Sequence, residues 1–348
     1  MSGAEARVMV CDDSATIRGA IGRMLDTDRA VRVVAKVANG QLAVDELKRT
    51  RADVVVLDIE MPVMDGLTAL PLLLRVDPGV RVIMASTLTT RGADIAMRAL
   101  RLGAADYVPK PSSIGTVADD RFQRELLEKV KGLARLRTPG PRAAPATGTR
   151  PPPLMPPRLL AIGSSTGGPQ ALFTLVQGLG KQIAVPVVLT QHMPPTFTPI
   201  LADHINKLGG MPCAEAKDGE MLASGRIYLA PGDKHLTVEG RAGAFRARLT
   251  NDPPENFCRP SVEPMLRTAC TACDGRVLIA MLTGMGHDGL SGTKQIVEAG
   301  GTAIAQDEAT SVVWGMPGAI AQAGLCHAVL PLSAMAGKLR ELLKGARP

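Results

Sequence analysis

A proline-rich segment divides the sequence into two parts. Residues 139–157 read PGPRAAPATGTRPPPLMPP, with eight prolines and no helical or strand periodicity. Such a segment favours polyproline-like extension and cannot pack a hydrophobic core, which is typical of a semi-rigid linker. The chain of 348 residues is also longer than one core usually supports. We therefore expect two domains, residues 1–137 and 158–348, joined by a linker over residues 138–157.

The first part alternates short apolar runs with amphipathic stretches. Its five apolar runs contain RVMVC, RVVAKV, DVVVLD, VRVIMAS and ADYVP. Strands that alternate with helices at this spacing indicate parallel pairing through right-handed crossovers. We predict a flavodoxin-like (βα)5 domain, a five-stranded doubly wound sheet with a last helix over residues 119–137. In such a sheet the functional site lies at the carboxyl ends of the strands.

The second part resumes the alternation with RLLAIG, VPVVLTQ, RIYLAPG, VLIAMLTG and TAIAQ. It therefore predicts another open α/β domain, doubly wound and mostly parallel, whose strand order the pattern leaves open. Residues 226–251 alternate in polarity around Gly240 and Gly243, which predicts an inserted hairpin.

Composition excludes several classes of function. The net charge of +7 is spread over both parts, aromatic residues are only 2%, and no helix-turn-helix pattern occurs, which argues against nucleic acid binding. No apolar stretch is long enough to span a membrane. The six cysteines are scattered and no N-terminal signal precedes them, so we expect a soluble, cytoplasmic protein. Cys270 and Cys273 have the spacing of metal ligands, but no second pair accompanies them, and a helical core pair is the alternative.

Four charged residues stand at strand ends of the first part. Asp12 and Asp13 follow the first strand, Asp58 the third and Lys110 the fifth, so all four share one edge of the sheet. Three neighbouring carboxylates repel one another unless a divalent cation intervenes, and an all-oxygen site suits Mg²⁺. A carboxylate beside a cation and a lysine is suited to accept a phosphoryl group, which makes Asp58 the candidate. Helix-capping aspartates are the alternative, although capping does not account for the lysine.

The motifs around these residues are CDDS, LDIEMPVMDG, MAST and YVPKP. In order and spacing they resemble the receiver domain of bacterial response regulators, over residues 7–130. The resemblance implies an aspartyl phosphate on Asp58. It also implies a Mg²⁺ ion held by Asp13, Asp58 and the carbonyl of Glu60, with Asp12 assisting.

The same resemblance assigns roles to two further strand ends. It implies that Ser86 carries the switch hydroxyl and that Lys110 contacts the phosphoryl group, with Thr87 as the alternative hydroxyl. It also implies a cis peptide bond before Pro111.

Two adjacent serines occur in the stretch LAIGSSTGGPQAL of the second part. A nucleophile elbow needs glycine two positions before and two after the serine, because the sharp turn from strand to helix leaves no room for side chains there. Ser165 has Gly163 and Gly167 at these positions, whereas Ser164 does not. Ser165 is therefore the candidate nucleophile, and a phosphate-binding turn is the alternative.

A serine needs a base, and all five histidines lie in the second part. His192 follows the strand VPVVLTQ and reaches the same sheet edge as Ser165, while Asp288 follows another strand end and can orient the imidazole. His287 is the alternative base. We expect His204 on the surface of a helix and His327 before a later strand.

Six motifs of the second part occur together: GSSTGGPQAL, QHMPPTFT, LAPGDKHL, RPSV, LTGMGHDGL and QDEATSVVWGMPGAI. Over residues 158–345 they closely resemble the catalytic domain of the CheB family of chemotaxis methylesterases. The resemblance implies that Ser165, His192 and Asp288 hydrolyse glutamate γ-methyl esters on methyl-accepting chemoreceptors without a cofactor, releasing methanol, and deamidate receptor glutamines. Backbone N–H groups near Thr166 and Met285 are the candidates for the oxyanion hole.

Receiver, linker and esterase together resemble this family over nearly the whole chain. The family is part of a two-component system, so the resemblance implies that a chemotaxis histidine kinase phosphorylates Asp58 and that phosphorylation relieves inhibition by a receiver docked over the esterase cleft. Two other functions remain open: an output half that only binds a partner, and a hydrolase for another ester or amide.

Overall fold

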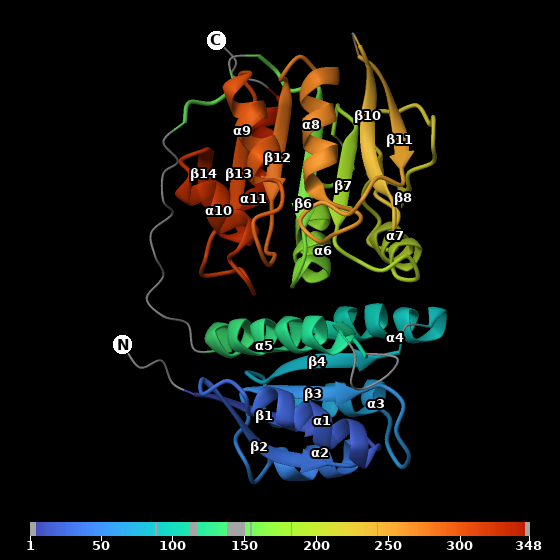
Figure 1. Cartoon of the computed structure of the whole chain (residues 1–348), viewed down its shortest axis with the longest axis vertical. Helices are drawn as coiled ribbons and strands as arrows, with labels where there is room; N and C mark the ends of the chain where they lie inside the picture. The colour runs from blue at the N-terminus through green and yellow to red at the C-terminus, as the bar shows by residue number, and fades with distance from the viewer. Residues whose placement is uncertain are drawn as a thin grey trace. The chain divides into compact units, whose positions relative to one another are not determined.

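The computed structural model describes residues 5–87, 89–110, 117–137, 150–153, 155–181, 183–241 and 243–344. The chain divides into two compact units, Met1–Pro141 and Arg142–Pro348 (Figure 1). Most of the expected linker lies outside the described residues, so its limits at 138 and 157 stay a prediction. Pro111, with its expected cis peptide bond, also lies outside them.

The first unit is built on a five-stranded parallel sheet of order β2-β1-β3-β4-β5, which confirms the doubly wound fold. The central strand reads VVVLD and is buried throughout, as expected for a parallel sheet covered on both faces. Helix α1 packs against α5, and α3 packs against α2 and α4. The strands are β1 (Ala6–Cys11), β2 (Val31–Val37), β3 (Val54–Asp58), β4 (Arg81–Ser86) and β5 (Asp106–Pro109). The helices are α1 (Ala15–Leu25), α2 (Gly40–Leu47), α3 (Gly66–Val76), α4 (Thr90–Arg101) and α5 (Val117–Arg137).

The second unit is built on a seven-stranded sheet of order β14-β13-β12-β6-β7-β9-β8, and all of its strand pairs are parallel. Helix α6 packs against α7 and α11, and α9 packs against α8 and α10. The strands are β6 (Leu159–Ser164), β7 (Val187–Gln191), β8 (Cys213–Glu215), β9 (Ile227–Leu229), β12 (Val277–Met281), β13 (Thr302–Gln306) and β14 (Cys326–Leu330). The helices are α6 (Gly168–Leu179), α7 (Thr198–Asn206), α8 (Val262–Ala272), α9 (Leu290–Glu298), α10 (Met316–Gln322) and α11 (Leu332–Leu343).

The expected hairpin is present as β10 (His235–Arg241) and β11 (Ala244–Thr250), an antiparallel pair beside α8 (Figure 1). It is shorter than predicted, because β9 within the same stretch joins the main sheet. Strand β8 was not predicted, because its three residues are too few for a clear period. The later strand expected beside His327 is present as β14, which reads CHAVL.

Two expectations about histidines are wrong. His204 is 1% exposed rather than on the surface, because α7 packs against β8 and α6. His327 lies inside β14 rather than before it. No helix in the described part of the chain is long and apolar enough to cross a membrane.

The position of the site follows from the strand order, which reverses direction at β6. The chain runs outward from β6 through β7 on one side and returns through β12 on the other. Loops that leave neighbouring strands at such a point in opposite directions open a crevice at the carboxyl ends. The loops after β6, β7 and β12 carry Ser165, His192 and Asp288 respectively.

Candidate active site and acidic cluster

The two adjacent serines have different surroundings. Ser164 is fully buried, and its hydroxyl donates a hydrogen bond of 2.7 Å to Gln191 Oε1. Ser165 is half-buried, and no hydrogen bond of its hydroxyl occurs within the described residues. A nucleophile must reach solvent and substrate, so these surroundings favour Ser165 over Ser164.

The backbone around Ser165 requires glycine at positions 163 and 167. Gly167 is the N-cap of α6 and has φ +74°, and a Cβ there would lie 2.5 Å from Val312 Cγ2. A Cβ on Gly163 would lie 2.9 Å from Met281 Sδ. The turn from β6 into α6 therefore has the glycine requirement of a nucleophile elbow.

Gln191 fixes the ends of β6 and β7 relative to each other. It pairs with Ser164 in the strand register, and its Nε2 donates to the carbonyls of Ser165 and His192 at 2.9 and 3.0 Å. The backbone N–H of His192 in turn donates to Ser164 O at 3.1 Å. Ser165 and His192 therefore follow two paired residues at one sheet edge, although no hydrogen bond between their side chains occurs in the described structure.

His192 pairs with the buried Asp288. Nε2 of His192 lies 2.7 Å from Asp288 Oδ2, and Nδ1 lies 3.4 Å from Cys258 Sγ. Burial alone would lower the pKa of His192, but the Asp288 carboxylate and the Cys258 contact outweigh it and raise the pKa above its ordinary value. The alternative base, His287, is exposed.

The Asp288 carboxylate sits at the N-terminus of α8. It accepts hydrogen bonds from the Val262 N–H at 2.7 Å, from Ser261 Oγ at 2.7 Å and from Asn256 Nδ2 at 3.0 Å. Burial would raise the pKa of Asp288, but the bonds from His192, Val262 and Ser261 outweigh it and lower the pKa. Helix N–H groups and a hydroxyl thus keep this carboxylate ionised and fixed in position.

Two backbone N–H groups remain available for an oxyanion beside Ser165. A Cβ on Gly284 would lie 2.9 Å from Ser165 Cβ, so the segment leading to Met285 lies directly against the serine. Neither the Thr166 N–H nor the Met285 N–H has an acceptor within the described residues. This arrangement is compatible with the predicted oxyanion hole.

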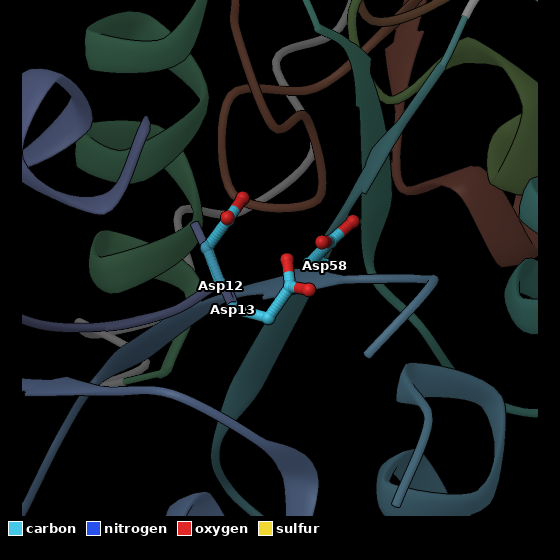
Figure 2. A group of neighbouring side chains, drawn as sticks. All are labelled: Asp12, Asp13 and Asp58. Carbon is cyan, nitrogen blue, oxygen red and sulfur yellow. The ribbon is translucent and has the colours of Figure 1, made fainter. Parts of the chain in front are cut away.

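The acidic cluster of the first unit lies at the ends of β1 and β3 (Figure 2). One carboxylate oxygen from each of Asp12, Asp13 and Asp58 lies within 4.8 Å of the other two. Nζ of Lys110 lies 2.7 Å from both Asp12 Oδ2 and Asp58 Oδ1. The N-terminal caps of α1 and α3 are Ser14 and Asp65, so helix capping does not explain the cluster.

The cluster fits a hard divalent cation. Burial raises the pKa of Asp58, and the neighbouring Asp12 adds to this, although Lys110 acts in the opposite direction. Three carboxylates against one ammonium leave excess negative charge on oxygen donors, which suits Mg²⁺. The Glu60 side chain points elsewhere, with Oε1 3.8 Å from Arg91 Nε, and the predicted ligand there is its backbone carbonyl.

The candidate switch hydroxyls differ in exposure. Ser86 ends β4 and is fully buried, and its carbonyl accepts a 2.7 Å hydrogen bond from the Lys110 N–H. Thr87 is exposed, with its hydroxyl 3.2 Å from that of Thr89. Ser86 therefore lies on the strand that pairs with Asp58 and beside Lys110.

Four contact residues of the second site were not predicted from the sequence. Asn256, Cys258 and Ser261 touch His192 or Asp288, and His235 accepts a 3.2 Å hydrogen bond from the Ser261 N–H. The RPSV motif contains Ser261, but nothing in its spacing indicates a contact with a residue 27 positions later.

The cysteine pair packs in the core of the second unit, as the helical core-pair alternative expects. Cys273 is fully buried in the core of the second unit, with Cys270 packed against it, and all six cysteines are free. Within the described residues the acidic cluster is the one group with the spacing of metal ligands.

Comparison with known proteins identifies both units. Residues 160–339 match the family described as CheB methylesterase, and residues 8–120 match the response regulator receiver domain. The chain belongs to the CheB methylesterase family. It is therefore an enzyme with a receiver domain followed by a CheB catalytic domain.

Relatives support this assignment over nearly the whole length. A protein-glutamate methylesterase/protein-glutamine glutaminase of Rhodospirillum centenum is 55% identical, covering 94% of this chain and 91% of the relative. One of Azospirillum brasilense is 54% identical, covering 99% and 94%. The crystal structure of the Thermotoga maritima CheB methylesterase catalytic domain is 38% identical, with a TM-score of 0.52, and covers 54% of this chain and all of that one.

Proposed function

We propose that this protein hydrolyses glutamate γ-methyl esters on chemoreceptors and deamidates receptor glutamines, under control of phosphorylation at Asp58. The observation that carries the proposal is the hydrogen-bonded pair of His192 and Asp288 at the sheet edge where Ser165 follows strand β6. Membership in the CheB family and the names of the relatives supply the substrate class.

Acylation begins with the serine. Ser165 Oγ attacks the γ-carbonyl carbon of the ester while His192 removes the hydroxyl proton. Because Nε2 of His192 is bonded to Asp288, the nitrogen left for this proton is Nδ1, and Ser165 must replace Cys258 at that nitrogen. The imidazolium that forms is stabilised by the ionised Asp288.

The tetrahedral intermediate then collapses. Its oxyanion accepts hydrogen bonds from the N–H groups of Thr166 and Met285, and the C–O bond to the methoxy group breaks as His192 returns the proton, so that methanol leaves. A water molecule attacks the acyl-serine, and His192 takes one proton from the water and passes it to Ser165. The glutamate side chain is released as the carboxylic acid, which loses its proton to solvent and becomes the carboxylate. A glutamine reacts by the same steps with ammonia as the leaving group.

The receiver domain supplies the control. Asp58 accepts the phosphoryl group from a chemotaxis histidine kinase, Lys110 contacts it, and Ser86 is the switch hydroxyl. Asp12, Asp13, Asp58 and the Glu60 carbonyl would hold Mg²⁺, which when bound neutralises charge on the transferred phosphoryl group. The ion pairs of Lys110 with the buried Asp12 and Asp58 support this proposal.

Methanol release from methylated chemoreceptor, with and without a small-molecule phosphodonor and Mg²⁺, tests the proposed function. We expect release by the wild type, faster with the donor, and no response to the donor in Asp58→Asn. Stimulation that persists in Asp58→Asn would contradict gating through this residue. A chain that releases neither methanol nor ammonia would contradict the proposed activity itself.

A further inference from the structure

One phenylalanine differs from all the others in its exposure. The chain has five phenylalanines, and four of them are at most 6% exposed. Phe257 is 93% exposed. Leaving a large apolar side chain in water forgoes roughly 1.5–3 kcal/mol of burial free energy.

The backbone at Phe257 is unfavourable as well. Glu255 and Cys258 exchange backbone hydrogen bonds of 3.2 and 2.9 Å across a two-residue turn. The central residues, Asn256 and Phe257, have φ of 51° and 61°, a region in which the second position of such turns usually holds glycine. A bulky side chain there is strained, and strain of this kind is concentrated at functional sites.

The residues before and after Phe257 both contact the candidate triad. Asn256 Nδ2 donates to Asp288 Oδ1 at 3.0 Å, and Cys258 Sγ lies 3.4 Å from His192 Nδ1. Phe257 adjoins both contact residues in the sequence, so its Cα lies about 3.8 Å from the Cα of each. Its exposed ring therefore stands at the rim of the catalytic site.

Two further contacts hold the turn in place. Arg267 donates two hydrogen bonds to the Glu255 carboxylate, at 2.8 and 3.1 Å. Nε2 of the fully buried His235 lies 3.1 Å from Pro253 O at the start of the same loop. A side chain presented by a fixed turn loses little conformational entropy when a partner binds.

We propose that Phe257 is a substrate-binding residue whose ring packs against an apolar side chain of the protein substrate, next to the glutamate that is hydrolysed. This inference rests on the proposed methylesterase function. It accounts for both unfavourable features, because the ring is buried and the strain is offset only when the protein substrate is bound. A small ester has no neighbouring side chain, so its hydrolysis does not use the ring.

The test compares two substrates, methylated chemoreceptor and N-acetylglutamate γ-methyl ester, in four variants. Phe257→Gly removes both ring and strain, Phe257→Ala removes the ring alone, and Phe257→Tyr keeps an aromatic ring. Met221→Ala is the matched control, because Met221 is 47% exposed in the same unit and lies outside the site.

We expect both ring deletions to lower kcat/KM for the receptor about tenfold, as for truncation of an aromatic anchor, without changing hydrolysis of the small ester. Phe257→Tyr and Met221→Ala should retain activity on both substrates. Phe257→Gly should not lower the melting temperature, since glycine suits the positive φ.

Other outcomes overturn the inference. A Phe257→Gly variant as active as wild type on the receptor refutes contact with the substrate. Equal losses on receptor and small ester mean that Phe257 acts through the triad instead. If the wild type hydrolyses neither substrate, the proposed function fails and the inference fails with it.

Discussion

Asp288 receives more hydrogen bonds than either of the other proposed triad residues. Its two oxygens accept from a side-chain imidazole, a hydroxyl, a carboxamide and the N-terminus of α8. Each donor favours the ionised carboxylate, and their directions fix its plane. His192 is thereby held in one orientation, with Nε2 toward Asp288.

Ser261→Ala should therefore weaken catalysis without weakening substrate binding. Loss of one hydrogen bond to a charged group costs about 1.5 kcal/mol, which corresponds to a roughly tenfold fall in kcat. Steady-state kinetics should show this fall at unchanged KM, and Ser261→Thr, which keeps the hydroxyl, should restore most of it. If unfolded protein alone caused the fall, kcat would return to the wild-type value once it is calculated per active enzyme molecule, and that result would contradict the proposed role of Ser261.

The pH profile should report the raised pKa of His192. A general base acts only when neutral, so activity is lost as the pH falls through its pKa. Because that pKa is raised, the rising limb of kcat/KM should lie at higher pH than the ordinary value for histidine. Cys258→Ala removes one of the contacts that raise it and should move the limb to lower pH. An unmoved limb would mean that the Cys258 contact is not maintained in solution.

At the scale of elements, the strand ends that carry the site were predictable, whereas the contact between the N-terminus of α8 and Asp288 was not. The alternation of apolar runs located β6, β7 and β12, and their carboxyl ends bring Ser165, His192 and Asp288 to one edge. The N-terminus of α8 contacts Asp288 through packing between distant segments, which no local spacing encodes. Likewise, the three-residue β8 is a strand because it pairs with β9, since its sequence carries no clear period.

Helix α5 is joined to β5 by buried charges. Nζ of Lys129 lies 3.2 Å from Asp106 Oδ2 and 2.9 Å from Glu125 Oε1, and both Lys129 and Asp106 are at most 3% exposed. Removing one partner leaves an uncompensated buried charge. Lys129→Met should therefore lower the free energy of unfolding of the first unit by about 3 kcal/mol, and adding Asp106→Leu should recover much of it.

The fluorescence of the single tryptophan allows the unfolding of the two units to be followed separately. Trp314 lies in the second unit, so its fluorescence follows that unit, whereas far-ultraviolet circular dichroism follows both. In urea, Lys129→Met should shift the dichroism transition and leave the fluorescence transition in place. A shift of both transitions by the same amount would contradict independent unfolding of the units.

At the scale of the whole molecule, the proline-rich segment already indicated two domains, and two compact units are found. Both cores are mainly aliphatic: aromatic residues make up only 2% of the sequence, and both sheets are lined by Val, Leu, Ile and Ala. Exposure of single residues was not predictable, as the buried His204 and the exposed Phe257 show. It depends on which neighbours cover a position after folding.

The most direct test of the account is methanol release from methylated chemoreceptor by Ser165→Ala and Ser164→Ala, measured beside the wild type. Ser165→Ala should abolish release, because it removes the proposed nucleophile. Ser164→Ala loses only its buried hydrogen bond to Gln191 and should keep measurable release at a cost of about 1 kcal/mol in stability. Release that survives in Ser165→Ala, or that disappears only in Ser164→Ala, would contradict the proposed triad.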